Sequence, residues 1–477
     1  MATDPIASFI RVYSEALRDQ NAAIFAGAGL SIPAGIVDWQ RLLRDIADEV
    51  GLDVKKEHDL VSVAQYHLNQ RGRHRINQAL VDEFSAKATL TDNHKILAAL
   101  PIRTFWTTNY DGLIERALEE AGKTPDVKIT PENLATTIHR RDAVVYKMHG
   151  DVSQPEKAIV TKEDYELYST TRQLFSTALQ GDLVSKTFLF LGFSFNDPNL
   201  AFILARIRIL LGTNVRHHYC LLRRVHRNDF PTVAAFHYAR AKQDLQVDDL
   251  RRYGIIGLLV DTYADYTNVL RRVSQTYRRS RVFISGSAVD YFPWDQPKAE
   301  ELIQEVARQL VANGFGVVSG AGIGVGQGVV NGVLEQLENE STRVVDDRLI
   351  LRQFPHGIAD PLERRRRWTE YRKEILSEAG IAIFLFGNKR SAAGTLVDAD
   401  GVEEEFRIAV AKHISVVPVG CTGSVAATLH KRVSDDFADY YPTRGYKALF
   451  ATLNKKRSVA RVAASIIRLV KKLRDNA

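Results

Sequence analysis

Short apolar runs alternate with amphipathic stretches along the first 280 or so residues of the chain. The runs are four to six residues long and rich in β-branched and aromatic residues. A strand that is apolar on both faces is typical of a parallel sheet covered by helices on both sides. The strands predicted for this first part are Ala22–Ala26, Arg103–Thr107, Ala143–Met148, Thr187–Gly192, Tyr219–Leu222 and Ile255–Val260.

Between the first two predicted strands the pattern changes from strand-like to helical. Residues from about Lys55 to Leu100 are rich in helix-forming residues and carry no strong strand signal, which predicts a helical insertion on the sheet. Just before it, Asp38 is placed to cap a helix. The apolar stripe of that helix is Leu42, Leu43, Ile46 and Val50.

A second alternation of strands and helices begins at Arg281. It includes an amphipathic helix over Ala299–Val311, and the pattern again predicts a doubly wound sheet. The fold class expected is therefore α/β, with two doubly wound parallel-sheet (Rossmann-like) domains at 1–280 and 281–477, the first with the helical insertion. The strands of the second domain are Val282–Ser285, Gly316–Ser319, Leu349–Gln353, Ile381–Phe386 and Val416–Val419.

Composition narrows the class of protein. A chain of 477 residues is too long for one hydrophobic core. Its two cysteines suit a reducing cytoplasm and exclude a four-cysteine zinc site. The N-terminus reads as neither a signal nor a transit peptide, and the apolar runs are too short to span a bilayer. We therefore expect a cytoplasmic protein without membrane contact. The net charge of +7 suits either nucleic acid or a pyrophosphate-bearing nucleotide.

The first predicted strand runs directly into a glycine turn. Gly27, Gly29 and Ser31 give the spacing Gly-x-Gly-x-Ser, which differs from the dinucleotide fingerprint G-x-G-x-x-G. Glycines at the end of a strand let backbone N–H groups approach a pyrophosphate. A plain tight turn explains this short motif about as well.

Polar residues follow three further strands, at the sheet edge where ligands bind in open α/β folds. Asn109 and Asp111 follow the second strand, His149 the third, and Ser194 and Asp197 the fourth. Each residue also has a purely structural interpretation. Asn109, Asp111 and Asp197 could be helix caps, and His149 could be a hydrogen-bonded loop histidine. Together on one edge they favour a nucleotide site.

These four motifs, in this order, resemble those of the sirtuin family. The resemblance implies that Gly27, Gly29 and Ser31 bind the phosphates of NAD. It also implies that Asn109 and Asp111 lie beside the nicotinamide ribose and that His149 is the general base. The remaining cofactor-binding residues expected at this edge are Ala26, Ala28, Thr108, Gly192, Ser194 and Asp197.

The chain departs from sirtuin deacylases because it lacks the cysteines of their zinc ribbon. Its Gly-Phe-Ser-Phe-x-Asp-Pro motif is similar to that of the zinc-less branch, whose members hydrolyse NAD in bacterial immunity. We therefore expect NAD+ as substrate and no metal. Cleavage passes through an oxocarbenium-like transition state, and a neutral imidazole such as that of His149 is able to deprotonate water or a ribose hydroxyl. Asn109 would hold the ribose or the attacking water.

In the second domain, glycine occurs at every second position from Gly320 to Gly328, between a strand and a helix. This predicts an anion cradle, although a flexible loop is the alternative. The four arginines at 364–367 are interpreted first as the solvent-exposed face of a helix. Further along the chain, Arg372 and Lys389 are cations suited to bind phosphates, and Glu405 is a carboxylate suited to bind a ribose diol. The residues expected to bind a ligand here are Gly286, Ser287, Gly320, Gly322, Gly324, Gly326, Arg372, Lys389 and Glu405.

This second domain is similar to the SLOG family, and the whole chain resembles the Thoeris anti-phage defence effectors. The resemblance implies that a cyclic ADP-ribose isomer, made by a TIR-domain partner protein, binds the SLOG domain and switches on NAD depletion. It implies a homo-oligomer, typically a tetramer, and carries Arg372, Lys389 and Glu405 over as signal-binding residues. The helical insertion is a candidate gate on position alone.

Three other functions stay open at this point. An NAD-dependent protein deacylase needs an acyl-lysine groove, for which the sequence shows no obvious wall. A nucleic-acid-binding effector without NADase activity would use the basic balance, but the chain has no recognised nucleic-acid motif, so nucleic acid is not expected as a partner. A non-catalytic nucleotide sensor is the third.

Overall fold

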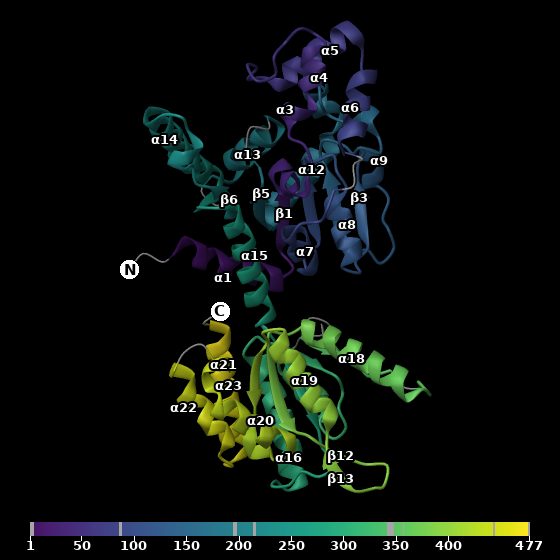
Figure 1. Cartoon of the computed structure of the whole chain (residues 1–477), viewed down its shortest axis with the longest axis vertical. Coiled ribbons are helices and arrows are strands. Elements are labelled where there is room, and N and C mark those ends of the chain that lie inside the picture. Colours follow the sequence, from purple (N-terminus) through teal and green to yellow (C-terminus); the bar gives the residue numbers. More distant parts are fainter. Residues whose placement is uncertain are drawn as a thin grey trace. The chain divides into compact units, whose positions relative to one another are not determined.

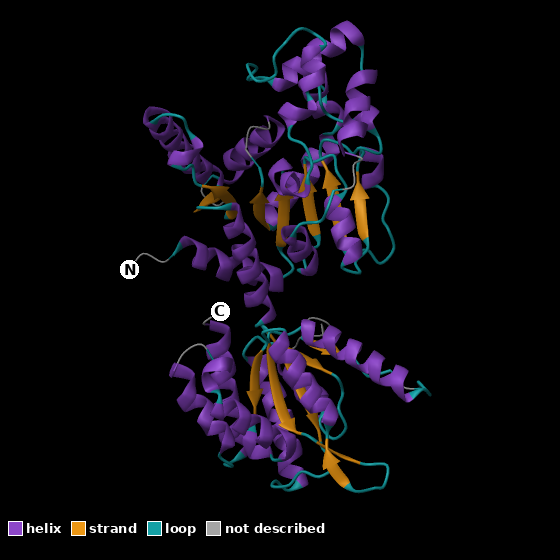
Figure 2. Ribbon diagram, in the orientation of Figure 1, coloured by secondary structure: helices purple, strands orange, loops and turns teal. Residues whose placement is uncertain are grey.

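The computed structural model describes residues 4–84, 88–193, 198–212, 216–340, 348–355, 357–441 and 444–475. The chain divides into two compact units, Met1–Ser274 and Gln275–Ala477 (Figure 1). The division falls six residues before the boundary expected between residues 280 and 281. Each unit holds one main sheet covered by helices (Figure 2). The α/β fold class with two doubly wound sheets is confirmed.

The sheet of unit 1 has seven strands in the order β3-β4-β2-β1-β5-β6-β7, and all pairings are parallel. Strands β1 and β5 are buried at every position, as their apolar runs predict. The six predicted strands are all present; β3 was not predicted. The strands are β1 (Ala22–Ala26), β2 (Thr104–Thr107), β3 (Pro125–Lys128), β4 (Ala143–Lys147), β5 (Thr187–Leu191), β6 (His218–Arg223) and β7 (Ile255–Val260).

The helices of unit 1 include a cluster at the predicted insertion, and the last of them, α15, begins in unit 1 and ends four residues beyond Ser274. Asp38 accepts a hydrogen bond from the Arg41 N–H at 2.9 Å and caps a helix as expected. That helix is interrupted at Leu43, and Val50 lies in the turn after it. The helices are α1 (Pro5–Arg18), α2 (Ala28–Ser31), α3 (Trp39–Leu42), α4 (Arg44–Asp48), α5 (Leu60–Arg71), α6 (His74–Phe84), α7 (Asp92–Ala99), α8 (Leu113–Glu120), α9 (Pro131–Leu134), α10 (Lys162–Glu166), α11 (Tyr168–Thr171), α12 (Gln173–Ser185), α13 (Pro198–Leu211), α14 (Val233–Leu250) and α15 (Tyr263–Arg278).

The sheet of unit 2 has five parallel strands in the order β10-β9-β8-β11-β14. All five were predicted, whereas the antiparallel hairpin β12-β13 was not. The strands are β8 (Arg281–Ser287), β9 (Gly316–Ser319), β10 (Leu349–Leu351), β11 (Ile381–Phe386), β12 (Asn388–Arg390), β13 (Leu396–Asp398) and β14 (Ser415–Pro418). The helices are α16 (Gln296–Ala312), α17 (Gly326–Asn339), α18 (Pro361–Ser377), α19 (Asp400–Ala411), α20 (Ser424–Asp435), α21 (Phe437–Tyr440), α22 (Lys447–Ala451) and α23 (Val459–Asp475).

The strand order places a ligand crevice in each sheet. In unit 1 the chain builds outward from β1 through β2, then returns to add β5 on the other side of β1. In unit 2 it builds outward from β8 through β9 and returns with β11. Ligands of doubly wound folds bind where the strand order reverses, outside the carboxyl ends of the strands. Both predicted glycine loops begin at such a point.

Candidate functional site

The candidate site of unit 1 is aligned by the register of four neighbouring strands. Thr107 is paired with Ala26 on one side and Lys147 on the other, and Ala26 is paired with Leu191. These residues end β2, β1, β4 and β5 respectively. The predicted site residues therefore follow the same level of the sheet by one or two positions. They are Gly27, Asn109, His149 and Gly192.

The glycine turn after β1 packs directly on the loop after β5. The Gly27 N–H donates to the Leu191 carbonyl at 2.9 Å, and the Gly29 N–H to the Gly192 carbonyl at 3.0 Å. A Cβ on Gly192, whose φ is +63°, would lie 2.3 Å from the backbone nitrogen of Leu30. These glycines are thus required by the contact between the two loops. The Gly27 and Gly29 amides already donate to carbonyls of the neighbouring loop. What the turn has left for a pyrophosphate is a close approach of the backbone and the N-terminus of α2.

Asn109 joins the loop after β2 to this glycine turn. Its Nδ2 donates to the Gly27 carbonyl at 3.1 Å and to the Ser31 hydroxyl at 3.0 Å, and the side chain is buried. Helix α8 instead begins after Gly112, so the capping interpretation of Asn109 is wrong. Because both amide hydrogens are used in this way, the side-chain carbonyl oxygen is the group of Asn109 that is left to accept a hydrogen bond.

The residues beside Asn109 have mixed roles. Asp111 Oδ1 accepts from the Leu113 N–H at 3.0 Å, which is the capping role considered for it. Its second oxygen, Oδ2, is buried and makes no hydrogen bond to any described residue. The Thr108 N–H donates to the Ala26 carbonyl at 3.3 Å. Asp111 therefore keeps one carboxylate oxygen that the fold does not use.

His149 is buried at the end of β4, with 3 % of its surface exposed. Its ring meets the edges of two tyrosines, with centroids 5.4 Å from Tyr165 and 6.4 Å from Tyr168. Its carbonyl accepts from the Ile159 N–H at 2.8 Å. The imidazole is therefore held in a fixed position by the two aromatic rings and is largely removed from bulk water.

A buried lysine connects the Asn109 and His149 loops. Lys147 Nζ forms ion pairs with Asp151 and, at 3.3 Å, with Glu115, and it donates to the Asp111 carbonyl at 2.5 Å. Burial lowers the pKa of this amine, but the two carboxylates outweigh it and the pKa lies above its usual value. Burial raises the pKa of Glu115. The charged group fixes the backbone on which Asn109 and His149 are carried.

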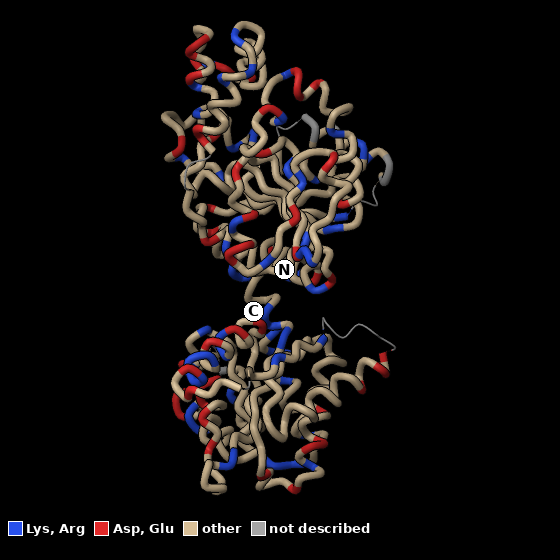
Figure 3. The backbone as a smooth tube through the Cα atoms, turned by 90° about the vertical axis from the view of Figure 1, so that its right-hand side faces the viewer, with Lys and Arg blue, Asp and Glu red and all other residues tan. Residues whose placement is uncertain are grey.

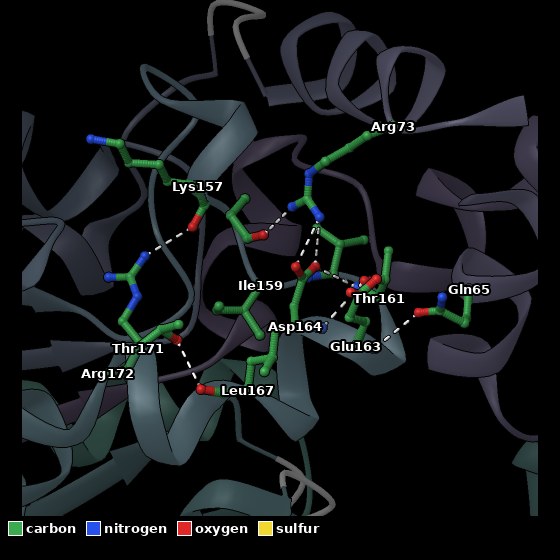
Figure 4. A network of polar contacts seen from close by, with 12 residues as sticks. Gln65, Arg73, Lys157, Ile159, Thr161, Glu163, Asp164, Leu167, Thr171 and Arg172 are labelled. Carbon is green, nitrogen blue, oxygen red and sulfur yellow. Dashed lines mark hydrogen bonds and ion pairs between the residues drawn. The ribbon is translucent and has the colours of Figure 1, made fainter. Parts of the chain in front are cut away.

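A further network anchors the segment that covers His149 (Figure 4). Arg73 of the helical insertion donates to both carboxylate oxygens of Asp164, at 2.8 and 2.9 Å, and to the Ala158 carbonyl. Beside this network is an open cavity of about 440 Å³, which the sequence did not predict. Its lining includes Thr130, Glu132, Lys157, Ile159, Leu167 and Arg172.

The glycine loop of unit 2 packs on the end of β8 in a similar way. A Cβ on Gly322 would lie 2.0 Å from the Gly286 carbonyl oxygen, and one on Gly324, whose φ is +71°, would lie 1.9 Å from that of Ala288. Helix α17 begins at Gly326, inside the glycine-rich stretch that was expected to precede it. Gly320 faces the ring of Phe354, 3.1 Å from where its Cβ would be. The loop is therefore closely packed, and the flexible-loop interpretation is wrong for its described residues.

Charged groups gather beside this loop. Glu405 accepts from the Ser285 hydroxyl at 2.5 Å and is 3.5 Å from the Arg372 Nε, and burial raises its pKa. The Arg372 guanidinium stacks over Phe354, 4.9 Å from the ring centroid. Lys389 is more exposed and pairs with Asp400 of α19. The structure thus brings Arg372 and Glu405 into contact, and Lys389, on β12, is paired with the first residue of the helix that carries Glu405.

The four-arginine run is a solvated face, as first interpreted. Arg366 and Arg367 pair with Glu363 at 2.8 Å on the exposed side of α18. Figure 3 shows basic and acidic residues interspersed over both units. No helix in the described part of the chain is long and apolar enough to cross a membrane. Within the described ranges, no group of three or more His, Cys, Asp or Glu side chains is placed to hold a metal.

Comparison with known proteins matches both units. Residues 103–246 match a SIR2-like domain, and residues 265–473 match the Sir2- and TIR-associating SLOG family. The chain is 48 % identical over 476 residues to the NAD(+) hydrolase ThsA of Bacillus cereus (strain MSX-D12), covering 98 % of this chain and 99 % of the relative. The chain belongs to the ThsA family. A second relative of that name, from Cytobacillus dafuensis, is 47 % identical over 449 residues, covering 92 % and 90 %.

The match to a ThsA protein confirms the predicted order of a sirtuin-like part followed by a SLOG part. A more distant relative, the defense-associated sirtuin 2 of Bacillus subtilis, is 28 % identical over 218 residues, covering 44 % of this chain and 21 % of that protein. It shares only part of the chain with the ThsA family. The SIR2-like match begins next to β2, so it includes Asn109 and His149 but not the glycine turn after β1.

Two residues that shape the site, His94 and Lys147, were not predicted from the sequence. His94 is 2 % exposed, and its ring accepts or donates a hydrogen bond at Thr91 Oγ1, 2.8 Å away. Burial lowers the pKa of His94 to about 4, and the nearby Asp111 opposes that shift. A histidine on the apolar face of α7 was the available signal. Lys147, a charge within a predicted strand, was the other. Ser194 and Asp197 lie outside the described residues.

Proposed function

We propose that this protein hydrolyses NAD+ at the nicotinamide–ribose bond, releasing nicotinamide and ADP-ribose, at the site formed by Asn109 and His149. The observation that carries the proposal is the register that brings Gly27, Asn109, His149 and Gly192 to one level at the switch point of the sheet. The ThsA relatives are named NAD(+) hydrolases, which supports the same reaction.

The chemistry assigned to each residue follows from its surroundings. The bond between nicotinamide and ribose C1′ breaks with its electron pair leaving on nicotinamide. Water forms the new C–O bond, and the neutral imidazole of His149 takes its proton. The Asn109 carbonyl oxygen, held by the bonds of its amide to Gly27 and Ser31, accepts from the water or a ribose hydroxyl. The free Oδ2 of Asp111 is available to a second hydroxyl.

The rest of the nucleotide site is assigned on the same basis. The turn from Ala26 to Ser31 approaches the pyrophosphate at the N-terminus of α2, with Thr108 beside it. Gly192 lines the opposite side of the crevice. Ser194 and Asp197 keep the cofactor-binding role expected for them from the sequence. NAD+ enters as substrate, and no step above requires a metal.

Unit 2 is proposed as the sensor that controls this activity. The contact of Arg372 with Glu405 beside the glycine loop, and the match to the SLOG family, support a nucleotide ligand. The ligand proposed is a cyclic ADP-ribose isomer supplied by a TIR-domain protein, with Arg372 and Lys389 at its phosphates and Glu405 at a ribose diol. The active protein would be a homo-oligomer, typically a tetramer, that depletes NAD in the bacterial cytoplasm during anti-phage defence.

The test is an NAD-consumption assay on the full chain, with and without cyclic ADP-ribose isomers. His149→Ala and Asn109→Ala should each lose roughly 10²–10⁴-fold in turnover. His139→Ala, at an exposed histidine ten residues from the site histidine, is the matched control and should keep wild-type turnover. Unchanged turnover in His149→Ala would overturn the assignment of the base.

Product analysis separates the remaining alternatives. Mass spectrometry should find free ADP-ribose; O-acyl-ADP-ribose formed from an acetylated peptide would establish a deacylase instead. Turnover should rise when a cyclic isomer is added, and Arg372→Met should weaken that response. Equal turnover with and without every isomer, in a protein that hydrolyses NAD, would refute the sensor role while leaving the hydrolase role intact.

A further inference from the structure

Helix α14 (Val233–Leu250) extends away from the sheet of unit 1 (Figure 1). Its buried side chains are Val247 and Leu250, both in the last turn, where Val247 packs on Gly257 of β7. Further along the same face, Gln243 exchanges hydrogen bonds with the backbone of Arg223 and Val225, at 2.8 and 3.1 Å. The helix is therefore attached along one side only.

The opposite side of α14 carries an exposed apolar stripe. Tyr238 is 72 % exposed and Leu245 is 71 % exposed, and the two alanines that complete the stripe are also exposed. The positions are separated by four, three and four residues, which is the spacing of a helix-pairing seam. At about 100° per residue, they point away from the attached face. We call Ala234, Tyr238, Ala241 and Leu245 the α14 seam.

We propose that the α14 seam pairs with the α14 seam of a second copy of this chain, antiparallel, about a two-fold axis between Ala239 and Arg240. In this register Ala234 faces the partner's Leu245, and Tyr238 faces the partner's Ala241. Each large side chain thus meets a small one, which lets the two helices approach closely. A two-fold pair uses the same surface on both copies, as homodimers commonly do.

The charges beside the seam favour the same direction. His237 and Asp244 lie on one flank of the stripe and are both exposed. Antiparallel pairing brings His237 next to the partner's Asp244, twice in the dimer. In a parallel pair each flank faces the opposite flank of the partner, so His237 and the partner's Asp244 would lie on opposite sides of the seam and would not meet. The inference does not depend on NAD hydrolysis, and the family resemblance, which implies an oligomer, does not say which surface forms it.

Disulfide trapping tests both the contact and its direction. The double variant Ala234→Cys/Leu245→Cys should form a covalent dimer under mild oxidation, because the two positions face each other across the axis. The two sites are eleven residues apart on one helix, about 16 Å, so they cannot bond within a chain. The native Cys220 and Cys421 are buried.

The two single-cysteine variants are the matched controls. In the antiparallel pair each new cysteine is about 16 Å from its own copy, so neither single variant should cross-link. Cross-linking in Ala234→Cys alone would overturn the antiparallel arrangement. Absence of cross-linking in the double variant, at concentrations where the chain is oligomeric, would overturn the contact itself.

Solution mass provides a second measurement. Leu245→Asp should halve the mass of the particle, measured against the 53.5 kDa of one chain by light scattering. Gln246→Asp, at the neighbouring exposed position outside the seam, should leave the mass unchanged. Wild-type mass in Leu245→Asp would overturn the proposal, as would a monomeric wild type. Binding of the wild-type chain to lipid vesicles that Leu245→Asp abolishes would assign the seam to a membrane and also overturn it.

Discussion

Replacing Lys147 with methionine should destabilise unit 1 by several kilocalories. The amine is fully buried and paired with Asp151 and Glu115, and it also donates to the carbonyls of Tyr110 and Asp111. Methionine fills a similar volume but leaves the two carboxylates without their counter-charge. Removing one partner of a buried ion pair costs about 3–5 kcal/mol. For a unit of this size the melting temperature should fall by roughly 6–20 °C.

The loss in the free energy of unfolding caused by Lys147→Met should be larger at high pH than at low pH. Burial already raises the pKa of Glu115, and Lys147 opposes that rise; without the lysine the pKa goes higher. A carboxyl whose pKa is higher in the folded state than in the unfolded state stabilises the fold below its unfolded pKa. That stability is lost as the pH rises through the folded pKa. Protonation of Glu115 therefore relieves the variant at low pH, and its deficit should be larger at pH 8 than at pH 5.5.

Urea unfolding at these two pH values measures the deficit. Lys162→Met, at an exposed lysine on α10, is the control and should stay within about 0.5 kcal/mol of wild type. Adding Glu115→Gln and Asp151→Asn to Lys147→Met should restore part of the stability, since neither carboxylate partner of the lysine is then charged. A deficit no larger than that of the control, or one that grows as the pH falls, would refute the reasoning.

Three further outcomes are expected. Burial lowers the pKa of His94 to about 4, so as the pH falls the unfolded chain takes up a proton before the folded chain does. The free energy of unfolding should therefore fall by about 3 kcal/mol between pH 6.5 and 4. In urea unfolding measured across this range, His94→Gln should remove that part of the pH dependence. Gly192→Ala should abolish thermal stabilisation by NAD+, because its Cβ would lie 2.3 Å from a backbone nitrogen, whereas Gly112→Ala meets no atom within 4 Å and should keep it. Arg73→Ala removes both hydrogen bonds to Asp164 and should cost about 1–3 kcal/mol in urea unfolding, with Arg73→Lys recovering only part because lysine cannot make the bidentate contact.

The sheets were predictable because their strands are apolar on both faces. The strand that was missed, β3, carries Asp126 and Lys128, which are buried as an ion pair at 2.7 Å. A buried charge pair leaves no apolar run in the sequence, so β3 is hidden from that signal. The hairpin β12-β13 was missed because it is short and largely exposed, where packing does not select residues.

The polar residues at strand ends were found because four of them recur at one edge. Their hydrogen-bond partners were not found, because those partners come from distant segments. Asn109 bonds Gly27 and Ser31, more than seventy residues away. Likewise Lys147 reads as a strand residue until the fold places Glu115 beside it. Spacing along a chain locates residues relative to their own element, whereas these contacts depend on register between elements.

The contact between the turn after β1 and the loop after β5 also has a consequence for protein synthesis. The amides of Gly27 and Gly29 donate to the carbonyls of Leu191 and Gly192. Strand β5 ends 165 residues after β1. At about 5–20 residues per second, the ribosome needs roughly 8–33 s to make that stretch. In the last part of this interval, after His149 has been made, the nascent chain carries Asn109 and His149 but not the loop after β5 that packs on the glycine turn. A polypeptide interrupted before β5 therefore lacks both carbonyls that hold the glycine turn in place.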